Sequence, residues 1–238
     1  DRVPGILKRF RQSVLAAATS GELTREWREE RGLDLTGWTR STVGQLIDGI
    51  EAGLNVQCDE RPPAENERGL VKISAVTWGI YNDNESKTLP GDAKVPERSR
   101  IRTGDFLISR ANTLELVGAC VIVHRVTRPV FLSDKILRLV MPDEWKPWLL
   151  LVLQSPAGRH EIEGRASGNQ LSMRNLSQAN LREIGVAIPS PEERAEIVRR
   201  VRSLLDFAAE LERRCRTERS LLEKLTPSLL AKAFRGEL

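Results

Sequence analysis

The chain of 238 residues has only two histidines and three cysteines. His124 and His160 leave little material for zinc binding or for acid–base catalysis. Cys58, Cys120 and Cys215 are odd in number and widely separated, which argues against a disulfide framework and against a CxxC metal site. The sequence therefore predicts a cytoplasmic protein, kept in a reducing environment, that binds no metal of its own.

Long apolar runs and a strong net charge are also missing. No run approaches the roughly 18 residues that a membrane span needs, and no signal-peptide pattern follows Asp1. Since 37 basic residues face 33 acidic ones, the net charge is only +4. Overall charge therefore barely favours a nucleic-acid partner, although residues 68–128 are rich enough in basic residues to form a local basic face.

Catalytic motifs are absent as well. The sequence contains no P-loop, no Gly-x-Gly-x-x-Gly and no Asn-Pro-Pro-Tyr/Phe motif of amino-methyltransferases. Residues 142–146 superficially match a nuclease PD…ExK pattern. Their acidic residues, Asp143 and Glu144, are adjacent and precede an apolar helical run, so we interpret them as helix-entry residues. These absences predict a protein without catalytic activity of its own.

What the sequence does have is a repeat that joins its two ends. Residues 6–23 align without gaps onto residues 221–238, an offset of 215 positions, which is domain-sized and unlike the solenoid periods of up to about 50 residues. The repeat predicts a protein that alternates a helical segment with a globular domain. The identical pairs are Leu7/Leu222, Ser13/Ser228, Leu15/Leu230, Ala16/Ala231, Ala18/Ala233, Gly21/Gly236, Glu22/Glu237 and Leu23/Leu238.

Periodicity divides the chain into three parts. Residues 6–20 are expected to form a helix that stops at Gly21, and residues 24–35 a charged connector. The middle predicts an α+β domain with mixed or antiparallel strands, between a short N-terminal helix and a long C-terminal coiled-coil helix. The expected strands are 70–74, 105–109, 117–123, 135–140 and 184–188, and the expected helices are 144–155 and 177–183.

From Pro191 to Phe234 apolar residues recur in alternating steps of four and three, as in a coiled-coil seam. A continuous helix of this length would span about 65 Å at ~1.5 Å per residue. A 3.5-residue period favours packing against a second helix; an amphipathic helix lying on its own domain is the alternative. The seam residues are Ile197, Val201, Leu204, Ala208, Leu211, Cys215, Leu222, Leu225 and Leu229.

Several phrases, in this order along the chain, resemble the specificity (S) subunits of type I restriction-modification systems. Each phrase is weak alone, but the ordered set with the terminal repeat is specific. One departure is Glu193-Arg194, where the family often has Glu-Gln. The phrases are Leu7–Ala18 with Gly21–Thr24, Gly37-Trp38, Val43-Gly44, Gly104–Arg110, Gly168–Gln170, Ile188–Pro191 with Ile197-Val198, and Leu222–Leu238.

The resemblance implies a domain plan. In that family two target-recognition domains alternate with two conserved helices, which pair antiparallel as a ruler between two DNA half-sites. By resemblance, residues 1–36 are the tail of the central conserved helix and a connector. Residues 37–190 are one target-recognition domain, and residues 191–238 are the long conserved coiled-coil helix for spacing and dimerisation. One recognition domain implies half an S subunit, either the C-terminal half of a longer protein or a separately encoded half.

The resemblance also implies partners. These are double-stranded DNA, methyltransferase (M) subunits and restriction (R) subunits, with S-adenosylmethionine and ATP with Mg expected on the partner subunits and no cofactor on this chain. A homodimer through the long helix is a further expectation, although residues 6–23 of one copy would compete there with residues 221–238 of the other. A coiled-coil adaptor without DNA binding is the alternative function.

For the recognition domain we expect loops that enter the major groove and read three or four base pairs. Arginine matches guanine, and asparagine or glutamine matches adenine, while phosphate contacts from lysine, arginine, serine and threonine fix the register. Such residues occur along the first long strand, after the strand at 106–109 and around Gly168. The DNA-binding candidates are Lys72, Ser74, Thr77, Arg110, Asn112, Arg165, Ser167, Asn169, Gln170 and Arg174.

Overall fold

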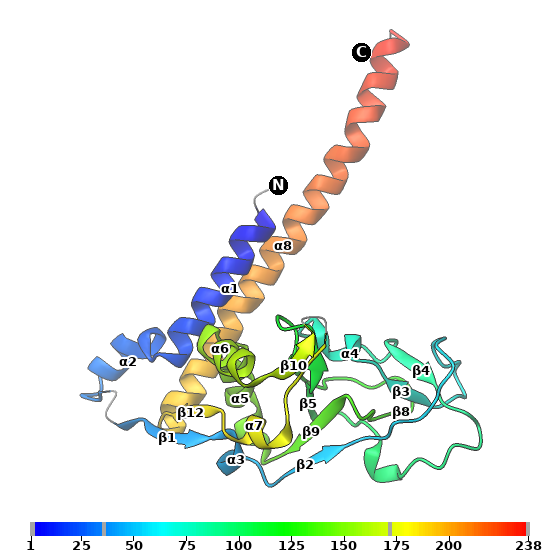
Figure 1. Ribbon diagram of the computed structural model, residues 1–238. Coiled ribbons are helices and arrows are strands. Elements are labelled where there is room, and N and C mark those ends of the chain that lie inside the picture. Colours follow the sequence, from blue (N-terminus) through cyan, green and yellow to red (C-terminus); the bar gives the residue numbers. More distant parts are fainter. Residues whose placement is uncertain (1–2, 35–36, 171–172, 237–238) are drawn as a thin grey trace.

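The computed structural model describes residues 3–34, 37–170 and 173–236, with side chains outside residues 169–170 and 224–233. Figure 1 shows a globular head, formed by residues 37–190, from which one long helix projects. This helix, α8 (Pro191–Phe234), is called the rod below. An α+β head between a short N-terminal helix and a long C-terminal helix is the fold class that the sequence predicts, and the structure confirms it.

A four-stranded antiparallel sheet forms the centre of the head. Its strands read as nearly continuous hydrophobic runs because both faces of the sheet are covered. The strands predicted at 105–109 and 135–140 are confirmed in this sheet, whereas the strand predicted at 117–123 is wrong in part, because residues 117–118 lie in a turn and the strand begins at Cys120. In spatial order its strands are β2 (Gly49–Ala52), β9 (Ile136–Val140), β5 (Phe106–Ser109) and β7 (Cys120–Ile122).

Helices cover one face of this sheet and a smaller sheet covers the other. Phe106 and Ile108 pack with the fully buried Trp148 of α5, while Leu107 packs into a second core with Val130 and Leu132. The covering helices are α5 (Lys146–Gln154), predicted at 144–155, and α6 (Pro156–Arg165), which the sequence analysis missed. The smaller sheet has the order β4 (Ser86–Thr88), β3 (Gly69–Val71), β8 (Val130–Phe131), with β3 and β8 parallel.

One predicted strand is wrong in part. The strand expected at 70–74 ends at Val71, and the next residues form the helical turn α4 (Ser74–Thr77). Alternation continues through residue 74, but Ala75 and Val76 are both fully buried, and a helical turn is what carries both of them into the core. Ser74 and Thr77 therefore lie on a helical turn and do not extend the strand.

The first and last strands of the head pair with each other beside the start of the rod at Pro191. β1 (Thr39–Thr42) pairs antiparallel with β12 (Gly185–Ile188), the strand predicted at 184–188. The short helices α3 (Val43–Leu46) and α7 (Gln178–Arg182) pack beside this ribbon, and the helix predicted at 177–183 is confirmed by α7. The polypeptide therefore enters and leaves the head at one place, next to Pro191.

The N-terminal helix α1 (Val3–Thr19) lies antiparallel along the rod (Figure 1). Two contacts fix the direction: Arg11 forms an ion pair with Glu212 at 2.6 Å, and Arg200 donates to the carbonyl of Leu23 at 2.9 Å. Val14, Leu15 and Ala18 of α1 are buried beside the rod and α5. The first half of the rod is thus held by its own chain.

The structure places the seam residues in two environments. Ile197, Val201 and Ala208 are buried and Leu204 is half-buried, so this half of the rod packs against a second helix, as the seam predicts, but that helix is α1 of the same chain, and α5 of the head adds a smaller contact of the kind the alternative expected. Beyond it the rod projects, and the remaining seam residues whose side chains are described are exposed: Leu211, Cys215 and Leu222. The side chains of Leu225 and Leu229 lie outside the described ones.

A buried carboxylate joins the rod to the segment before the head. Glu193 is 3% exposed; Thr24 Oγ1 donates to its Oε1 at 2.6 Å, and Trp38 Nε1 donates to its Oε2 at 2.7 Å. The guanidinium of Arg28 also donates to Glu193 and to the carbonyl of Gly21. The expected connector at 24–35 is therefore wrong in part, because a buried charge needs hydrogen-bonded partners and these lie in η1 (Glu22–Thr24) and α2 (Arg25–Glu29).

Candidate nucleic-acid interface

A small antiparallel sheet gathers candidate residues from two distant segments of the chain. Its order is β10 (Ser167–Gln170), β11 (Met173–Asn175), β6 (Ala111–Asn112). Figure 1 shows β10 on the side of the head toward which the rod extends. The sequence analysis expected these candidates in separate loops, and the structure joins them through pairing of β11 with β6. We call this three-stranded sheet the reading sheet.

The register decides which side chains share a face of the reading sheet. Arg174 is paired directly with Asn112, and Asn175 with Ala111. Ala111 is fully buried and points into the head. Since successive side chains of a strand alternate between faces, Asn112 and Arg174 point to the opposite face, and Arg110 follows the same alternation. One face thus presents two guanidinium groups and one amide.

Arg110 is the most available of these groups. Its backbone is held on both sides, because its N–H donates to the carbonyl of Lys135 at 2.9 Å and its own carbonyl accepts from Leu176 at 2.8 Å. The half-buried guanidinium makes no hydrogen bond or ion pair with any described residue. Its five N–H donors are therefore available to a ligand.

The β10–β11 hairpin is held by its own polar groups. Arg174 donates through one terminal nitrogen to the carbonyl of Gly168 at 2.7 Å, and Ser167 Oγ donates to the carbonyl of Asn175 at 3.3 Å. Gly168 has φ +132°, and a Cβ there would lie 2.7 Å from the carbonyl oxygen of Met173. Only glycine fits this conformation without strain. The side chains of Asn169 and Gln170 lie outside the described ones.

The amide of Asn112 keeps most of its hydrogen-bonding capacity. Its Oδ1 accepts from the backbone N–H of Thr113 at 2.9 Å, which orients the side chain. The NH₂ group and a second lone pair of the oxygen remain, and this combination is what an adenine edge requires.

The other candidates are engaged within the head and are not gathered on the reading sheet. Arg165 forms an ion pair with Glu161 at 3.0 Å, and Lys72 donates to the carbonyl of Glu60 at 3.1 Å. Ser74 Oγ donates to Glu85 at 2.6 Å, and Thr77 Oγ1 to the carbonyl of Ile73 at 2.9 Å. Since these groups already have partners inside the head, a DNA role for them stays a prediction with no geometric support.

Sequence reasoning missed two polar neighbours of the reading sheet. Asn175 ends β11, and the exposed Lys135 lies in the turn that binds the backbone of Arg110. The β-propensity of residues 173–175 is low, and nothing local connects residue 135 to residue 110. Both residues are recognised as neighbours of the reading sheet only from the pairing of distant segments in the folded chain.

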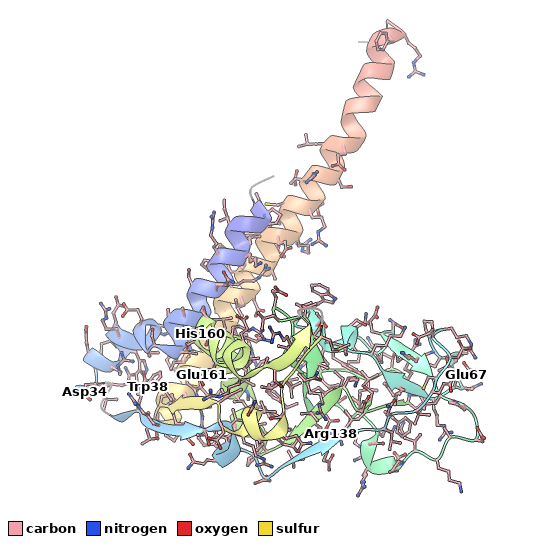
Figure 2. The ribbon with its side chains drawn as sticks, in the orientation of Figure 1. Asp34, Trp38, Glu67, Arg138, His160 and Glu161 are labelled. Atoms are coloured by element: carbon pink, nitrogen blue, oxygen red, sulfur yellow. The ribbon has the colours of Figure 1, made fainter. Side chains whose placement is uncertain are left out.

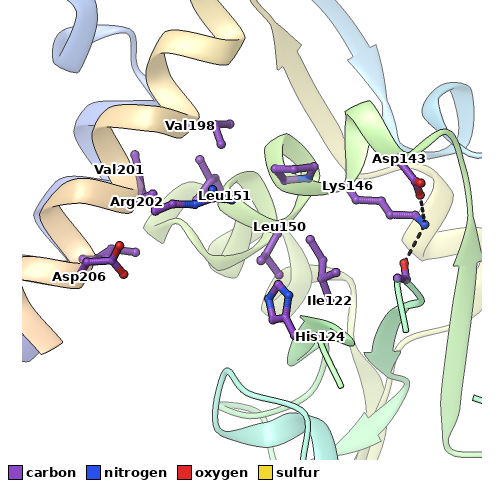
Figure 3. Close-up of a pocket in the computed structure, with 13 residues that line it drawn as sticks. Ile122, His124, Asp143, Lys146, Leu150, Leu151, Val198, Val201, Arg202 and Asp206 are labelled. Carbon is purple, nitrogen blue, oxygen red and sulfur yellow. Dashed lines mark hydrogen bonds and ion pairs between the residues drawn. The ribbon is translucent and has the colours of Figure 1, made fainter. Parts of the chain in front are cut away.

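Metal or acid–base chemistry has no assembled site in the described part of the chain, where no three His, Cys, Asp or Glu side chains converge. Figure 2 shows His160 on α6, whereas Figure 3 shows His124 beside Leu150, in a groove between α5 and the rod. Asp143, in the turn η4 (Asp143–Trp145), is exposed and forms an ion pair with Lys146. Cys58, Cys120 and Cys215 are free thiols, and no described helix is long and apolar enough to cross a membrane.

Known proteins resemble this chain over its whole length. It is 30% identical over 243 residues to the type I restriction enzyme EcoKI specificity subunit of Escherichia coli (strain K12), covering 100% of the chain and 51% of that protein. It is 28% identical over 241 residues to the StySPI specificity subunit of Salmonella potsdam, again covering 100% and 51%. The chain thus spans about half the length of the curated relatives it matches. No family model matches it.

The fold is shared with a solved structure as well. A chain from work on complex assembly and conformational transition of the type I R-M system superposes with a TM-score of 0.60 at 21% identity. The match covers 100% of this chain and 56% of that one. The combination of an α+β head with a long helix is therefore one that known proteins use.

Proposed function

The chain is a homologue of the specificity subunits of type I restriction enzymes and spans about half of their length; on that premise we propose that it reads one half of a bipartite DNA target. The reading sheet would enter the major groove, with Arg110, Asn112 and Arg174 facing base edges. Arginine forks match guanine, and the asparagine amide matches adenine. The observation that carries the proposal is the half-buried guanidinium of Arg110, which has no hydrogen-bond or ion-pair partner among the described residues, beside the Asn112–Arg174 pair.

The rod would hold the head at a fixed distance from a second half-site. Its continuous helix and the antiparallel α1 support this role. On its surface away from the buried contacts the rod exposes Phe207, Leu211 and Leu221, which are 60%, 37% and 49% exposed. Exposed apolar residues at helical spacing suit docking of a further helix. We assign this docking to methyltransferase subunits, restriction subunits or a second copy of the chain.

The chain itself would be non-catalytic. S-adenosylmethionine, and ATP with Mg, would then be bound by the partner subunits, and no group on this chain is assigned to them. The free thiols support a cytoplasmic location, because disulfides are rare there. A coiled-coil adaptor without DNA binding is the competing function, and the likeness to named specificity subunits favours DNA recognition over it.

The test is selection of duplexes from a randomised pool by the full chain, with the Arg110→Gln variant in parallel. The expected result is a preferred motif of three or four base pairs, at one of which the variant loses its preference. One bidentate contact is worth about 1–3 kcal/mol of discrimination. Binding should also weaken steeply with salt, because phosphate contacts release counterions.

Asn66→Ala is the matched control, because Asn66 is an exposed residue in a loop of the head that is not part of the reading sheet. It should leave the selected motif unchanged. If the native chain selected no motif and its binding showed no salt dependence, the adaptor function would replace the proposal. If the chain selected a motif that Arg110→Gln left intact, the reading sheet would not be the reader.

A further inference from the structure

Five arginines lie on two backbone segments that meet at the end of β5 opposite to the reading sheet. They come from two segments: Arg98, Arg100 and Arg102 precede β5, and Arg125 and Arg128 follow β7. Arg98 belongs to the turn η3 (Glu97–Ser99). We call these five residues the arginine cluster. Four are exposed and Arg128 is half-buried.

Backbone hydrogen bonds hold the two segments side by side. The N–H of Gly104 donates to Val123 at 2.7 Å, and that of Ile101 donates to Val130 at 2.8 Å. Between the segments lies a hollow of about 410 Å³, lined by Arg100, Arg102 and Arg128 among others. The backbone of the arginine cluster is thus held in place by the sheet.

Few acidic groups offset this charge. Glu97 is the carboxylate of the hollow, and it lies 3.4 Å from Arg100 and 3.8 Å from Arg102. Asp105, the next acidic residue along the chain, is already paired with Arg138 at 2.7 Å. Arg98, Arg125 and Arg128 form no ion pair with any described residue, and the guanidinium of Arg128 donates to the carbonyl of Pro63 at 3.1 Å. The cluster thus holds more guanidinium groups than carboxylates, and this excess of positive charge attracts an anion with several negative charges.

The cluster continues toward the rod. His124, next to Arg125, lines the groove between α5 and the rod, and Arg202 lies on the opposite wall of that groove (Figure 3). Arg202 forms no ion pair with a described residue either. Asp143 and Asp206 line the same groove, so the basic side chains between the cluster and the rod stand beside acidic ones.

The arginine cluster and the reading sheet lie at opposite ends of the strand β5. Arg102 lies in the turn before β5, where the N–H of Asp105 donates to the carbonyl of Arg102 at 3.1 Å, and Arg110 follows the end of β5. The extended residues of β5 at ~3.3 Å each measure about 13 Å. Phosphates follow one another along a DNA strand at about 3.4 Å of helix axis, so this length corresponds to about four base-pair steps. A single duplex is long enough to contact both ends of β5.

We propose that the arginine cluster binds phosphates of the DNA backbone, as a contact separate from base reading; this rests on the proposed function. Guanidinium groups bind phosphate oxygens through paired hydrogen bonds. Contacts of this kind fix the register of a protein on DNA and add affinity without sequence preference. The cluster thereby supplies basic surface that the small net charge of +4 does not suggest.

The experiment measures binding of the full chain to a random-sequence duplex of 30 base pairs between 50 and 300 mM salt. The double variants Arg100→Gln/Arg102→Gln and Arg98→Gln/Arg125→Gln change exposed side chains, so folding is retained and checked by circular dichroism. Each lost phosphate contact lowers the slope of log K against log salt by about 0.9. Each double variant should therefore lower it by about 1.8, with the motif selected from a randomised pool unchanged.

Arg213→Gln/Arg214→Gln on the rod is the matched control, because it removes the same charge from exposed residues. It should change the slope less than either cluster variant. Cluster variants with the native slope, or a control with an equal loss, would overturn the inference and leave base reading standing. Failure of the native chain to bind the duplex would overturn both proposals, and a changed motif would assign the cluster to base reading.

Discussion

Asn112 and Arg174 are direct partners across β6 and β11, so an amide and a guanidinium from distant parts of the chain stand side by side on one face. Directly opposed residues of antiparallel strands have Cα atoms about 4.5–5.5 Å apart. At this spacing the amide and the guanidinium can contact the same ligand.

For this pair we expect coupled losses of DNA discrimination. Asn112→Ala and Arg174→Gln should each cost about 1–3 kcal/mol at one base pair. Since the residues are in contact range, the double variant should depart from additivity by about 0.5 kcal/mol or more. Competition binding with the preferred duplex and single mismatches measures all three values. Strict additivity would mean that the two side chains act independently.

Gly168 should be required for the shape of the β10–β11 hairpin. Gly168→Ala places a Cβ 2.7 Å from the Met173 carbonyl oxygen at φ +132°, so the hairpin must shift. We expect weaker base preference and a loss of stability of about 1 kcal/mol or more. Gly164→Ala in α6 is the control, because nothing lies within 4 Å of its Cβ position; it should be neutral or stabilising. Urea unfolding and duplex selection report the two effects, and equal behaviour of the variants would contradict this prediction.

Glu193 should be a large contributor to stability at the foot of the rod. Glu193→Ala leaves the guanidinium of Arg28 buried without its counter-ion, which typically costs about 3–5 kcal/mol. Glu193→Gln keeps an acceptor for Thr24 and Arg28 and should cost less. Urea unfolding compares them with Glu210→Ala, which removes an exposed carboxylate of the rod and should change stability little. A small effect of Glu193→Ala would show that the junction tolerates an unpaired charge.

The three thiols should differ in reactivity. Burial raises the pKa of Cys120 to about 12, so its thiol should stay unreactive in the folded chain. Cys215 is exposed and should react first, while burial raises the pKa of the half-buried Cys58 and slows it. Labelling with Ellman's reagent at pH 8 gives the order, with single Cys→Ser variants for assignment. A helix docked on the far half of the rod should slow Cys215 alone; labelling of Cys120 at the rate of Cys215 would contradict the buried position.

Acid should weaken the rod between about pH 4.5 and pH 2. Hydrogen bonds from Arg199 and Arg200 lower the pKa of Glu196 to about 2, below its usual range. A lowered folded-state pKa stabilises above the unfolded-state pKa, and that contribution disappears as pH falls toward the folded-state value. The effect should be small and weakened by salt, because the side chains of Arg199 and Arg200 are 67% and 30% exposed. Helical circular dichroism against pH should show a flatter acid limb for Glu196→Gln, and an unchanged limb would exclude this pair as a cause.

Local patterns were reliable where one periodicity ran for long enough. Apolar steps of four and three predicted the rod without a break, and the buried runs at 105–109 and 135–140 predicted two central strands. These patterns failed where an element buries only a few of its residues. In α6 only Gly158 and Ile162 are buried, so no apolar period marks that helix.

The candidate site likewise combines features that the sequence predicts with features that only the fold determines. Residue type alone singled out Arg110, Asn112 and Arg174 as candidates for DNA reading, because forked donors and amides are what base edges require. Their grouping depends on β11 pairing with β6, and the same tertiary packing gave Lys72, Ser74, Thr77 and Arg165 partners inside the head. Nothing in the local sequence distinguishes these outcomes, because partner choice between distant segments is set by the packed core.

By itself, the sequence determined the elements and the kind of chemistry: a long apolar-striped helix, an α+β head, and polar groups suited to DNA. Tertiary structure alone decided that α1 covers half of the rod's seam, that Glu193 is buried under Arg28, and that two distant segments form one reading sheet. The physical reason is the distance along the sequence between the residues that interact. Periodicity and residue type can be recognised from neighbouring positions, whereas register, burial and ion pairing depend on which remote segments meet when the core is packed.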